Sequence, residues 1–410
     1  MVADNNNLKD VYFSDTTLRD GEQMPGASLT PEEKVEIAKA LAKAGIHSLD
    51  AGFPACASSE IEAIQGIVKE VKGPVISALC RALDSDIDKA YEALAEAEPY
   101  KRAVSIFVAT SPIHREYKLR KSKAQLLEMI VNAIHYARQK FEIIAFSPED
   151  ASRTELNYLC EIYQAAIEAG ATTIGFPDTV GILTPEKTRT TIRYILNHVP
   201  NIARAFMAVH FHNDLGLATS NTLAALEEGV QIVQCAVNGI GERAGNTALE
   251  EVVIALLLNQ EQYQRAVDID PKQLVSLSQL VAEKTSIPIA PNKAVVGSNI
   301  FATEAGIHQD GILKNLDTYL PFRPEMVGAE GIQIVLGKHS GRAAIAQRLK
   351  KLNFCLTEQQ LDLVVAALKD AKKNEWLDAE RLFSQTVKQL FGEQASFVSD
   401  LNERKSTIEV

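Results

Sequence analysis

The amino-acid sequence predicts an α/β protein whose main part is a (β/α)8 TIM barrel, followed by a small mixed subdomain and a helical C-terminal subdomain. Eight short β-branched or apolar runs alternate with helical segments up to about residue 260. Such alternation implies parallel strands joined by helical crossovers. Eight strands in this length match a (β/α)8 barrel, and a doubly wound open sheet is the alternative.

The eight runs are the expected strands, and the segments between them carry apolar residues at helical spacing. Thr30-Pro31 and Thr184-Pro185 place a capping residue and a proline at two helix starts, and Gly45 and Gly170 fall where helices should end. The expected strands are residues 11–14, 48–53, 74–79, 103–109, 143–147, 172–177, 207–211 and 231–237. The clearest expected helices are residues 33–43, 59–71, 124–138, 155–169 and 221–228.

Beyond the barrel the pattern changes. Residues 271–350 contain proline, glycine and short mixed segments, and residues 357–391 return to helical spacing. We therefore predict a barrel domain at 1–270, an accessory linker subdomain at 271–350 and a helical subdomain at 351–410.

Composition excludes several classes of protein. Hydrophobic residues make up 46% and charged residues 23% of the 410 residues, which is ordinary for a globular protein. A net charge of −11 argues against a nucleic-acid partner. No apolar run approaches the roughly 18 residues that span a bilayer, so we expect no membrane partner. Five widely spaced cysteines without a CxxC pair indicate reduced, mostly buried thiols in a cytoplasmic enzyme.

Polar clusters follow five of the expected strands. The active sites of such barrels are built at the carboxyl ends of the strands, so these clusters should converge on one site. The clusters are residues 15–23, 147–150, 177–179, 210–214 and 238–246.

His210 and His212 lie two residues apart at the end of a strand, so both imidazoles should point to the same side. A single histidine there would more often be a satisfied core residue. The pair, on the rim where Asp20 also projects, favours a divalent-metal site for Mg, Mn or Zn.

Four other features remain ambiguous from the residues alone. Arg19 could simply pair with a neighbouring acid, and Glu149 could be a solvated acid at a helix start. The glycines of residues 238–246 fail the GxGxxG spacing, so this loop either approaches a phosphate-bearing ligand or makes tight turns. The glycine-flanked segments 306–311 and 337–342 could be surface loops, but His308 is also a candidate for acid–base work.

Seven motifs, in chain order, resemble those of the acyl-CoA-dependent 2-oxo acid synthases of the DRE-TIM superfamily. This family includes the 2-isopropylmalate, homocitrate and citramalate synthases, and the chain is most similar to the first of these, without their C-terminal regulatory domain. The motifs are DTTLRDGEQ (15–23), SPED (147–150), PDTVG (177–181), VHFHNDLGL (209–217), NGIGERAGN (238–246), GIHQDG (306–311) and LGKHSGR (336–342).

The resemblance implies a role for each matching position. The implied metal ligands are Asp20, His210, His212 and Asn246, and the implied catalytic residues are Arg19, Glu149, His308 and Tyr319. The implied substrate-binding residues are Arg19, Gln23, Ser105, Ser147 and Thr179, and the implied coenzyme A-binding residues are Gly241 and Arg243.

The resemblance also implies the reaction. It is a Claisen-type condensation of acetyl-CoA with a 2-oxo acid, 2-oxoisovalerate first of all, followed by thioester hydrolysis to 2-isopropylmalate and CoA. Such an acyltransferase of leucine biosynthesis is expected to be a cytoplasmic homodimer. Ser105 stands where many relatives carry histidine, Asp50 where they carry glutamate, and Thr303 where histidine is frequent. Phenylpyruvate, a methylthio-2-oxo acid, pyruvate and 2-oxoglutarate therefore stay open as alternative substrates.

Two other functions compete with this one. A hydroxyacyl-CoA lyase of the same superfamily needs a reactive cysteine in the loop 238–246, but that loop contains none, and Cys235 lies back within a strand. A non-catalytic barrel is the second, because a fold alone does not imply activity.

Overall fold

The computed structural model describes residues 8–337, 339–351, 357–371, 379–392 and 407–408. Lys338 of the LGKHSGR motif and Cys355 lie outside the described residues, as does much of the predicted subdomain 351–410. The chain divides into two compact units, Met1–Ile289 and Ala290–Val410.

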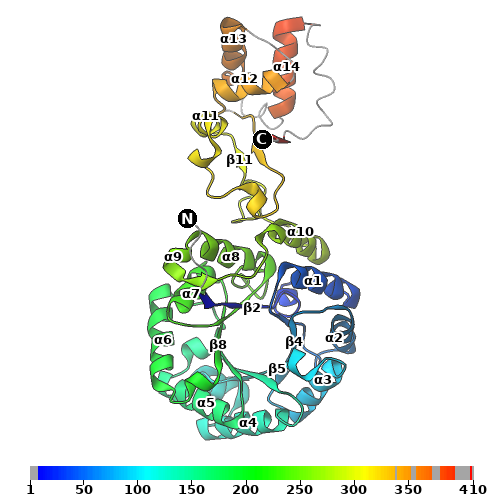
Figure 1. The fold of residues 1–410 in the computed structure, drawn as a ribbon, viewed down its shortest axis with the longest axis vertical. Helices are drawn as coiled ribbons and strands as arrows, with labels where there is room; N and C mark the ends of the chain where they lie inside the picture. Colours follow the sequence, from blue (N-terminus) through cyan, green and yellow to red (C-terminus); the bar gives the residue numbers. More distant parts are fainter. Residues whose placement is uncertain (1–7, 338, 352–356, 372–378, 393–406, 409–410) are drawn as a thin grey trace. The chain divides into compact units, whose positions relative to one another are not determined.

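The first unit contains the predicted barrel. Eight parallel strands pair in chain order, and β2 closes the ring against β9, with Tyr12 opposite Ile232 and Asp15 opposite Cys235. Figure 1 shows this ring end-on. All eight expected strands are confirmed, each within a few residues. The barrel strands are β2 (Tyr12–Asp15), β3 (Ser48–Asp50), β4 (Val75–Arg81), β5 (Arg102–Ala109), β6 (Ile143–Glu149), β7 (Thr173–Asp178), β8 (Phe206–Phe211) and β9 (Ile232–Cys235).

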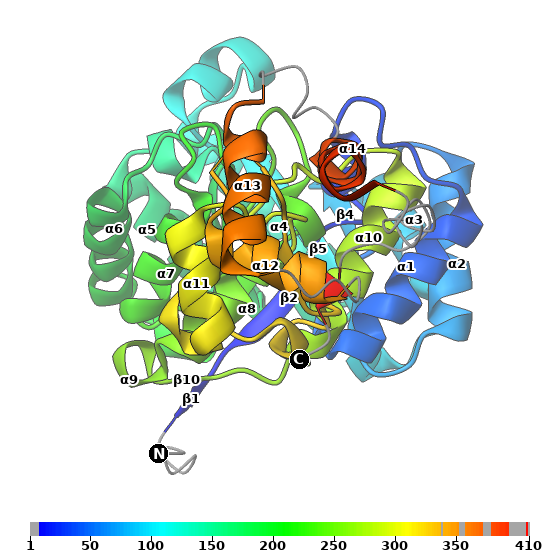
Figure 2. The same ribbon diagram turned by 90° about the horizontal axis from the view of Figure 1, so that it is seen from above.

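Helices surround the barrel, with α1 to α3 on one side and α5 to α7 on the other (Figure 2). Thr30 forms a full capping box with Glu33, and Gly45 and Gly170 adopt the left-handed conformation that ends a helix, as predicted. The helices are α1 (Pro31–Ala44), α2 (Ser58–Glu70), α3 (Asp84–Leu94), α4 (Lys123–Ala137), α5 (Leu156–Ala169), α6 (Pro185–His198), α7 (Ala218–Glu227), α8 (Leu249–Leu258), α9 (Gln260–Tyr263) and α10 (Leu274–Thr285). A short parallel pair, β1 (Lys9–Asp10) and β10 (Arg265–Ala266), lies outside the ring.

The hydrophobic core is the shell between strands and helices. Side chains that alternate outward along the strands, such as Phe146, Phe176 and Phe211, are fully buried. Along β6 the other alternate positions remain only partly buried. Three cysteines of the barrel unit are buried and Cys56 is exposed.

The second unit is smaller and mixed. Its strands β11 (Ala302–Thr303), β12 (Ile332–Ile334) and β13 (Thr407–Ile408) form one sheet in that order. Its helices are α11 (Gly306–Lys314), α12 (Arg342–Lys351), α13 (Glu358–Lys369) and α14 (Ala379–Phe391). Leu336 and apolar side chains of α12, α13 and α14 form a separate core.

Two features differ from the sequence-based expectation. α10 packs against α1 and belongs to the barrel unit, so this unit extends beyond the predicted boundary at 270. The segment around His308 is a helix rather than a loop. Its glycines allow close approach instead of breaking the helix, because a Cβ on Gly306 would lie 2.6 Å from the Gly341 nitrogen and one on Gly311 within 2.9 Å of the Tyr319 ring. The predicted boundary at residue 350, between the linker subdomain and the helical subdomain, stays a prediction.

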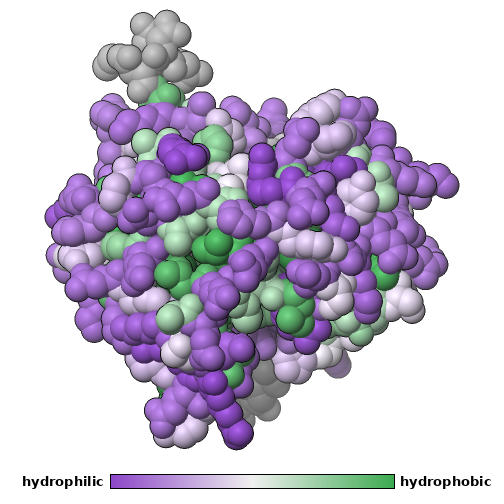
Figure 3. All heavy atoms as spheres, turned by 90° about the horizontal axis from the view of Figure 1, so that it is seen from below, coloured by the Kyte–Doolittle hydropathy of each residue, from purple (hydrophilic) through white to green (hydrophobic). Residues whose placement is uncertain are grey.

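In the part of the chain that the structure describes, no helix is both long and apolar enough to cross a membrane. Hydrophilic residues cover most of the face seen in Figure 3, with smaller apolar areas between them.

Candidate metal centre

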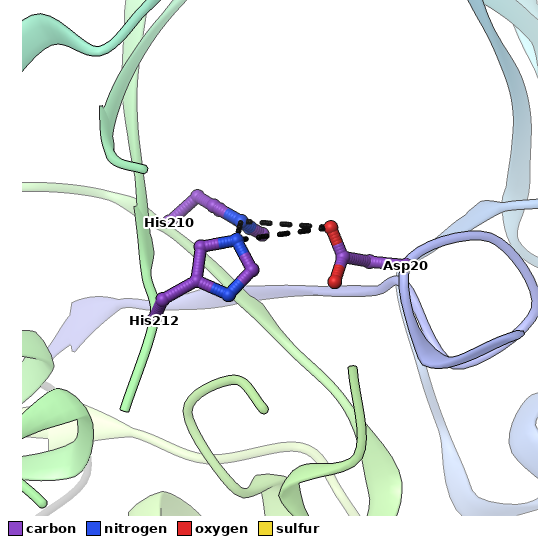
Figure 4. A group of neighbouring side chains, drawn as sticks. All are labelled: Asp20, His210 and His212. Carbon is purple, nitrogen blue, oxygen red and sulfur yellow. Dashed lines mark hydrogen bonds and ion pairs between the residues drawn. The ribbon is translucent and has the colours of Figure 1, made fainter. Parts of the chain in front are cut away.

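Asp20, His210 and His212 converge at the carboxyl end of the barrel, and their ligating atoms all lie within 4.8 Å of one another (Figure 4). The two Nε2 atoms are 3.1 Å apart, and each is 3.9 Å from Asp20 Oδ2. Asp20 follows β2, whereas the two histidines come from β8 and the residue after it. Two imidazole nitrogens and a carboxylate oxygen in this space are a donor set suited to a divalent cation.

The surroundings of His210 and Asp20 favour the protonation states that bind metal. Burial lowers the pKa of the His210 imidazole to about 3, so the ring is neutral at physiological pH. Burial alone would raise the pKa of Asp20, but the Arg19 guanidinium and the two imidazoles outweigh it and lower the pKa below its ordinary value. The Nδ1 atom of His212 lies 3.2 Å from the Gly245 carbonyl; donation to that oxygen leaves Nε2 free to face the other donors.

Asn246, the predicted fourth ligand, contacts Asp20. Its buried Nδ2 donates to Asp20 Oδ1 and to the Ile240 carbonyl, both at 2.9 Å. Its Oδ1 is buried and has no hydrogen-bond partner among the described residues. A buried amide oxygen without a partner is costly unless a cation or water satisfies it. A backbone bridge between His212 and Asn246 brings this amide to the centre.

The conformation and surroundings of Gly241 show why the loop at residues 238–246 needs glycine at this position. Its φ of 151° lies outside the range of ordinary side chains, and a Cβ there would collide with the Asn246 amide and lie 2.7 Å from Asp20 Oδ1. Asn238 and Arg243 also have positive φ. The loop therefore makes tight turns that let the backbone approach the centre. Binding of coenzyme A by Gly241 and Arg243 stays a prediction.

Replacing Asn246 by alanine removes the orphan oxygen and the amide that holds Asp20. We expect the dissociation constant for Mn²⁺ to rise roughly 10- to 100-fold, the range found for residues that orient metal ligands. Titration calorimetry on the purified protein measures it. Asn132→Ala, at an exposed position of α4, is the control; an unchanged affinity in Asn246→Ala would contradict this role of the amide.

Arg19 lies between two carboxylates. Its Nη1 is 2.6 Å from Asp20 Oδ2 and its Nε is 2.8 Å from Asp50 Oδ2. The Thr16 hydroxyl donates to the same Asp50 oxygen at 3.0 Å. The ion pair considered from the sequence thus exists, but it fixes the guanidinium beside the cluster rather than at a surface. Asp50, noted in the sequence only as a substitution, is the residue that orients Arg19.

Glu149 ends β6 on the same rim. Lys118 Nζ contacts both of its carboxylate oxygens at 2.7 and 2.8 Å, and His114 Nδ1 lies 3.4 Å from Oε1. Both partners belong to the π-helix His114–Leu119, a rare element that occurs frequently at functional sites. Sequence reasoning missed these partners, although basic residues in the segment that follows a barrel strand, here β5, are a signal that could have found them.

The other predicted substrate residues lie on or near the barrel strands. Ser105 and Ser147 line the barrel interior, together with His210. Thr179 follows β7 and accepts a hydrogen bond from the Asp150 amide at 2.8 Å. Gln23 ends the short helix Gly21–Gln23 after Asp20, and its side chain is exposed. Arg243 contacts Asp214 at 2.8 Å and donates to the Thr179 carbonyl at 2.7 Å.

His308 and Tyr319 lie in the second unit. Their rings stack with centroids 4.1 Å apart, and both line a small cavity of about 100 Å³ with Thr303. Both side chains are exposed. The structure brings these two residues together, and their catalytic role stays a prediction.

Comparisons with known proteins agree with this geometry. Residues 10–281 match the HMGL-like family model, and residues 295–375 match the model described as homocitrate synthase post-HMGL domain-like. The chain is 48% identical over 371 residues to 2-isopropylmalate synthase of Pyrococcus abyssi, covering 90% of this chain and 76% of that protein. It is 47% identical over 373 residues to the Aquifex aeolicus 2-isopropylmalate synthase, covering 90% and 71%.

A solved structure shares the fold. The HMG-CoA lyase of Bacillus subtilis superposes with a TM-score of 0.59 at 21% identity, covering 68% of this chain and 95% of that chain. At this identity the likeness concerns the fold alone.

Proposed function

Since this chain belongs to the HMGL-like family, we propose that it is an acyltransferase that condenses acetyl-CoA with a 2-oxo acid, 2-oxoisovalerate first of all, and releases 2-isopropylmalate and CoA. The observation that carries the proposal is the convergence of Asp20, His210 and His212 next to Arg19. The chain is similar to a 2-isopropylmalate synthase over 90% of its length, and the proposed reaction is taken from this similarity.

The residues present fit a divalent cation. Asp20, His210 and His212 would hold it, with the orphan Asn246 Oδ1 as the fourth ligand. When bound, such a cation would act as a Lewis acid that polarises the carbonyl of the 2-oxo acid. Donors of mixed nitrogen and oxygen type suit Mg, Mn or Zn and do not select among them.

Each remaining residue has a task that follows from its position. Arg19, fixed by Asp50, supplies positive charge where the alkoxide oxygen of the product develops. Ser105 and Ser147 line the space beside His210, where the acid's side chain lies. Glu149, held by Lys118, is the candidate proton carrier at the rim. Thioester hydrolysis then makes the overall condensation effectively irreversible.

The competing lyase reaction lacks its thiol. Cys235 is fully buried in β9, and burial raises the pKa of its thiol well above the ordinary value. Such a group does not supply a thiolate to a substrate.

A thiol-release assay tests the proposal directly. With acetyl-CoA, a divalent cation and 2-oxoisovalerate, we expect free CoA and 2-isopropylmalate in equal amounts. Omitting either the cation or the acid should stop the release. A protein that cleaves a hydroxyacyl-CoA instead would contradict the proposal, and so would one that releases no thiol with any 2-oxo acid.

Replacing Glu149 by glutamine should leave cation and 2-oxo acid affinity within about threefold, while kcat falls roughly 10²- to 10⁴-fold, the usual contribution of general acid–base catalysis. Calorimetry measures the affinities and thiol release measures kcat. The control is Glu142→Gln, an exposed glutamate just before the opposite end of β6. If 2-oxo acid binding is lost in Glu149→Gln, the residue positions substrate and does not transfer protons.

A role in leucine biosynthesis is proposed from the name of the relatives. Cytoplasmic location and a homodimeric assembly are proposed from the motif resemblance described in the sequence analysis.

A further inference from the structure

The interior of this barrel is hollow. TIM-barrel interiors are normally filled by layers of bulky branched side chains. Here the inward positions at mid-height are small, and many of them remain partly exposed. They enclose a cavity of about 610 Å³. The small strand residues that line it include Ser14, Ser77, Ser105, Ala145, Gly175 and Ala208.

The cavity runs along the barrel axis towards the candidate metal centre. His210, Ala208 and Phe206 lie on the same face of β8 and all line the cavity. Two residues along a strand span about 6.6 Å, so Ala208 lies about that far below the imidazole and Phe206 about 13 Å below it. A ligand held at the imidazole can therefore extend its side chain straight down the axis.

The size of the cavity exceeds what isopropyl requires. An apolar cavity of about 150 Å³ suffices to hold a benzene ring. The lumen is roughly four times larger, whereas the side chain of 2-oxoisovalerate has only three carbons. The volume also lies within the roughly 300–1,000 Å³ range of small-molecule sites.

The lining selects the chemistry of the side chain. Apart from His210, the only lining residues with a charged or titrating basic group are His47 and Lys101, which flank the amino ends of β3 and β5, and a tyrosine, Tyr12, lies at the same level in β2. The middle of the lumen offers serine hydroxyls, the Gln234 amide and methyl groups, and no cationic side chain. A second carboxylate, as in 2-oxoglutarate, would meet hydroxyl groups there but no cationic side chain, so no counter-charge would offset its desolvation.

We propose that the barrel lumen accepts the side chain of the 2-oxo acid, and that the substrates include acids with side chains larger than isopropyl, unbranched alkyl or aryl. The inference rests on the proposed function and specifies the substrate class of that site. An aryl or six-carbon chain fills apolar volume that 2-oxoisovalerate leaves empty, so its binding gains from burial.

The test compares pyruvate, 2-oxoisovalerate, 2-oxooctanoate, phenylpyruvate and 2-oxoglutarate in the thiol-release assay. We expect kcat/KM for 2-oxooctanoate and phenylpyruvate within about tenfold of that for 2-oxoisovalerate, and no measurable turnover of 2-oxoglutarate. A leucine at 208 or at 145 blocks the lumen. Ala208→Leu and Ala145→Leu should each lower kcat/KM for the two large acids at least tenfold relative to pyruvate, since misfit methylenes cost roughly 10- to 200-fold.

Ala124→Leu is the matched control, because it makes the same substitution at an exposed position of α4 and should keep the substrate ratios of the unmodified protein. Calorimetric binding of phenylpyruvate to the cation-loaded protein gives a readout that does not depend on turnover, and the two lumen Leu variants should weaken it at least tenfold. Thermal unfolding shows which variants are folded. Because two lumen positions are tested, the comparison remains possible if one of the two lumen Leu variants does not fold.

Two results would overturn the inference and leave the proposed function intact. One is turnover of 2-oxoisovalerate with more than hundredfold discrimination against both large acids. The other is lumen Leu variants that are folded and keep the original substrate ratios. Absence of thiol release with every acid would instead overturn the proposed function, and the inference with it.

Discussion

Replacing His210 or His212 by alanine is expected to lower kcat/KM at least about 10³-fold and to abolish its dependence on added cation. The two Nε2 atoms lie 3.1 Å apart and 3.9 Å from Asp20 Oδ2, so each variant removes one of three converging donors. Polarisation of a carbonyl by a bound cation supplies several kcal/mol, and each 1.36 kcal/mol is a factor of ten in rate. Thiol release at increasing Mn²⁺ concentration measures both quantities.

The control for the histidine variants is His135→Ala, because His135 is exposed on α4. Cation affinity from calorimetry should fall in parallel with activity in both centre variants and remain unchanged in the control. Near-normal, cation-dependent turnover in either His210→Ala or His212→Ala would show that the ion binds elsewhere.

Replacing Arg19 by glutamine should lower kcat about 10²- to 10³-fold, the loss measured when one preorganised donor to a developing oxyanion is removed. It should also lower the free energy of unfolding by roughly 3–5 kcal/mol, because Asp20 and Asp50 are almost fully buried and lose their shared partner. Arg19→Lys keeps the charge but cannot contact both carboxylates in the same fork, so its effects should be intermediate.

A double variant separates the two effects of Arg19. Adding Asp50→Asn to Arg19→Gln removes one unpaired carboxylate, and part of the lost stability should return while kcat stays low. Urea unfolding and thiol release measure the two quantities independently. Recovery of kcat in the double variant would mean that Arg19 only neutralises Asp50 and takes no part in the reaction.

The sequence alone was sufficient for the barrel and for the convergence of its polar ends. Strand and helix periods, the capping residue Thr30 and the cap at Gly45 are local signals, and the structure agrees with each. His210 and His212 could be paired because alternation along a strand is also local. Asp20 could be added because all parallel strands present their carboxyl ends at one rim.

Other features depended on distances that no local pattern encodes. The contact between Lys118 and Glu149 joins a π-helix to the next strand, and the fork of Arg19 depends on Asp50, 31 residues away. The hollow lumen depends on volume, because small inward residues on strands β2 to β8 leave a cavity only once the ring closes. The segment at His308 was expected to be a loop because glycine usually breaks helices, whereas here Gly311 makes room for Tyr319.

The closure of the ring by β2 and β9 has a consequence for how the protein folds. Asp20 and Asn246 are 226 residues apart in the chain, yet they meet in one hydrogen bond at the seam where the first strand pairs with the last. A cation at this site would bind only molecules in which β2 and β9 have already paired. By mass action, a higher cation concentration would then favour molecules with a closed barrel over molecules with an unpaired seam. The cation that serves the reaction would therefore also stabilise the fold.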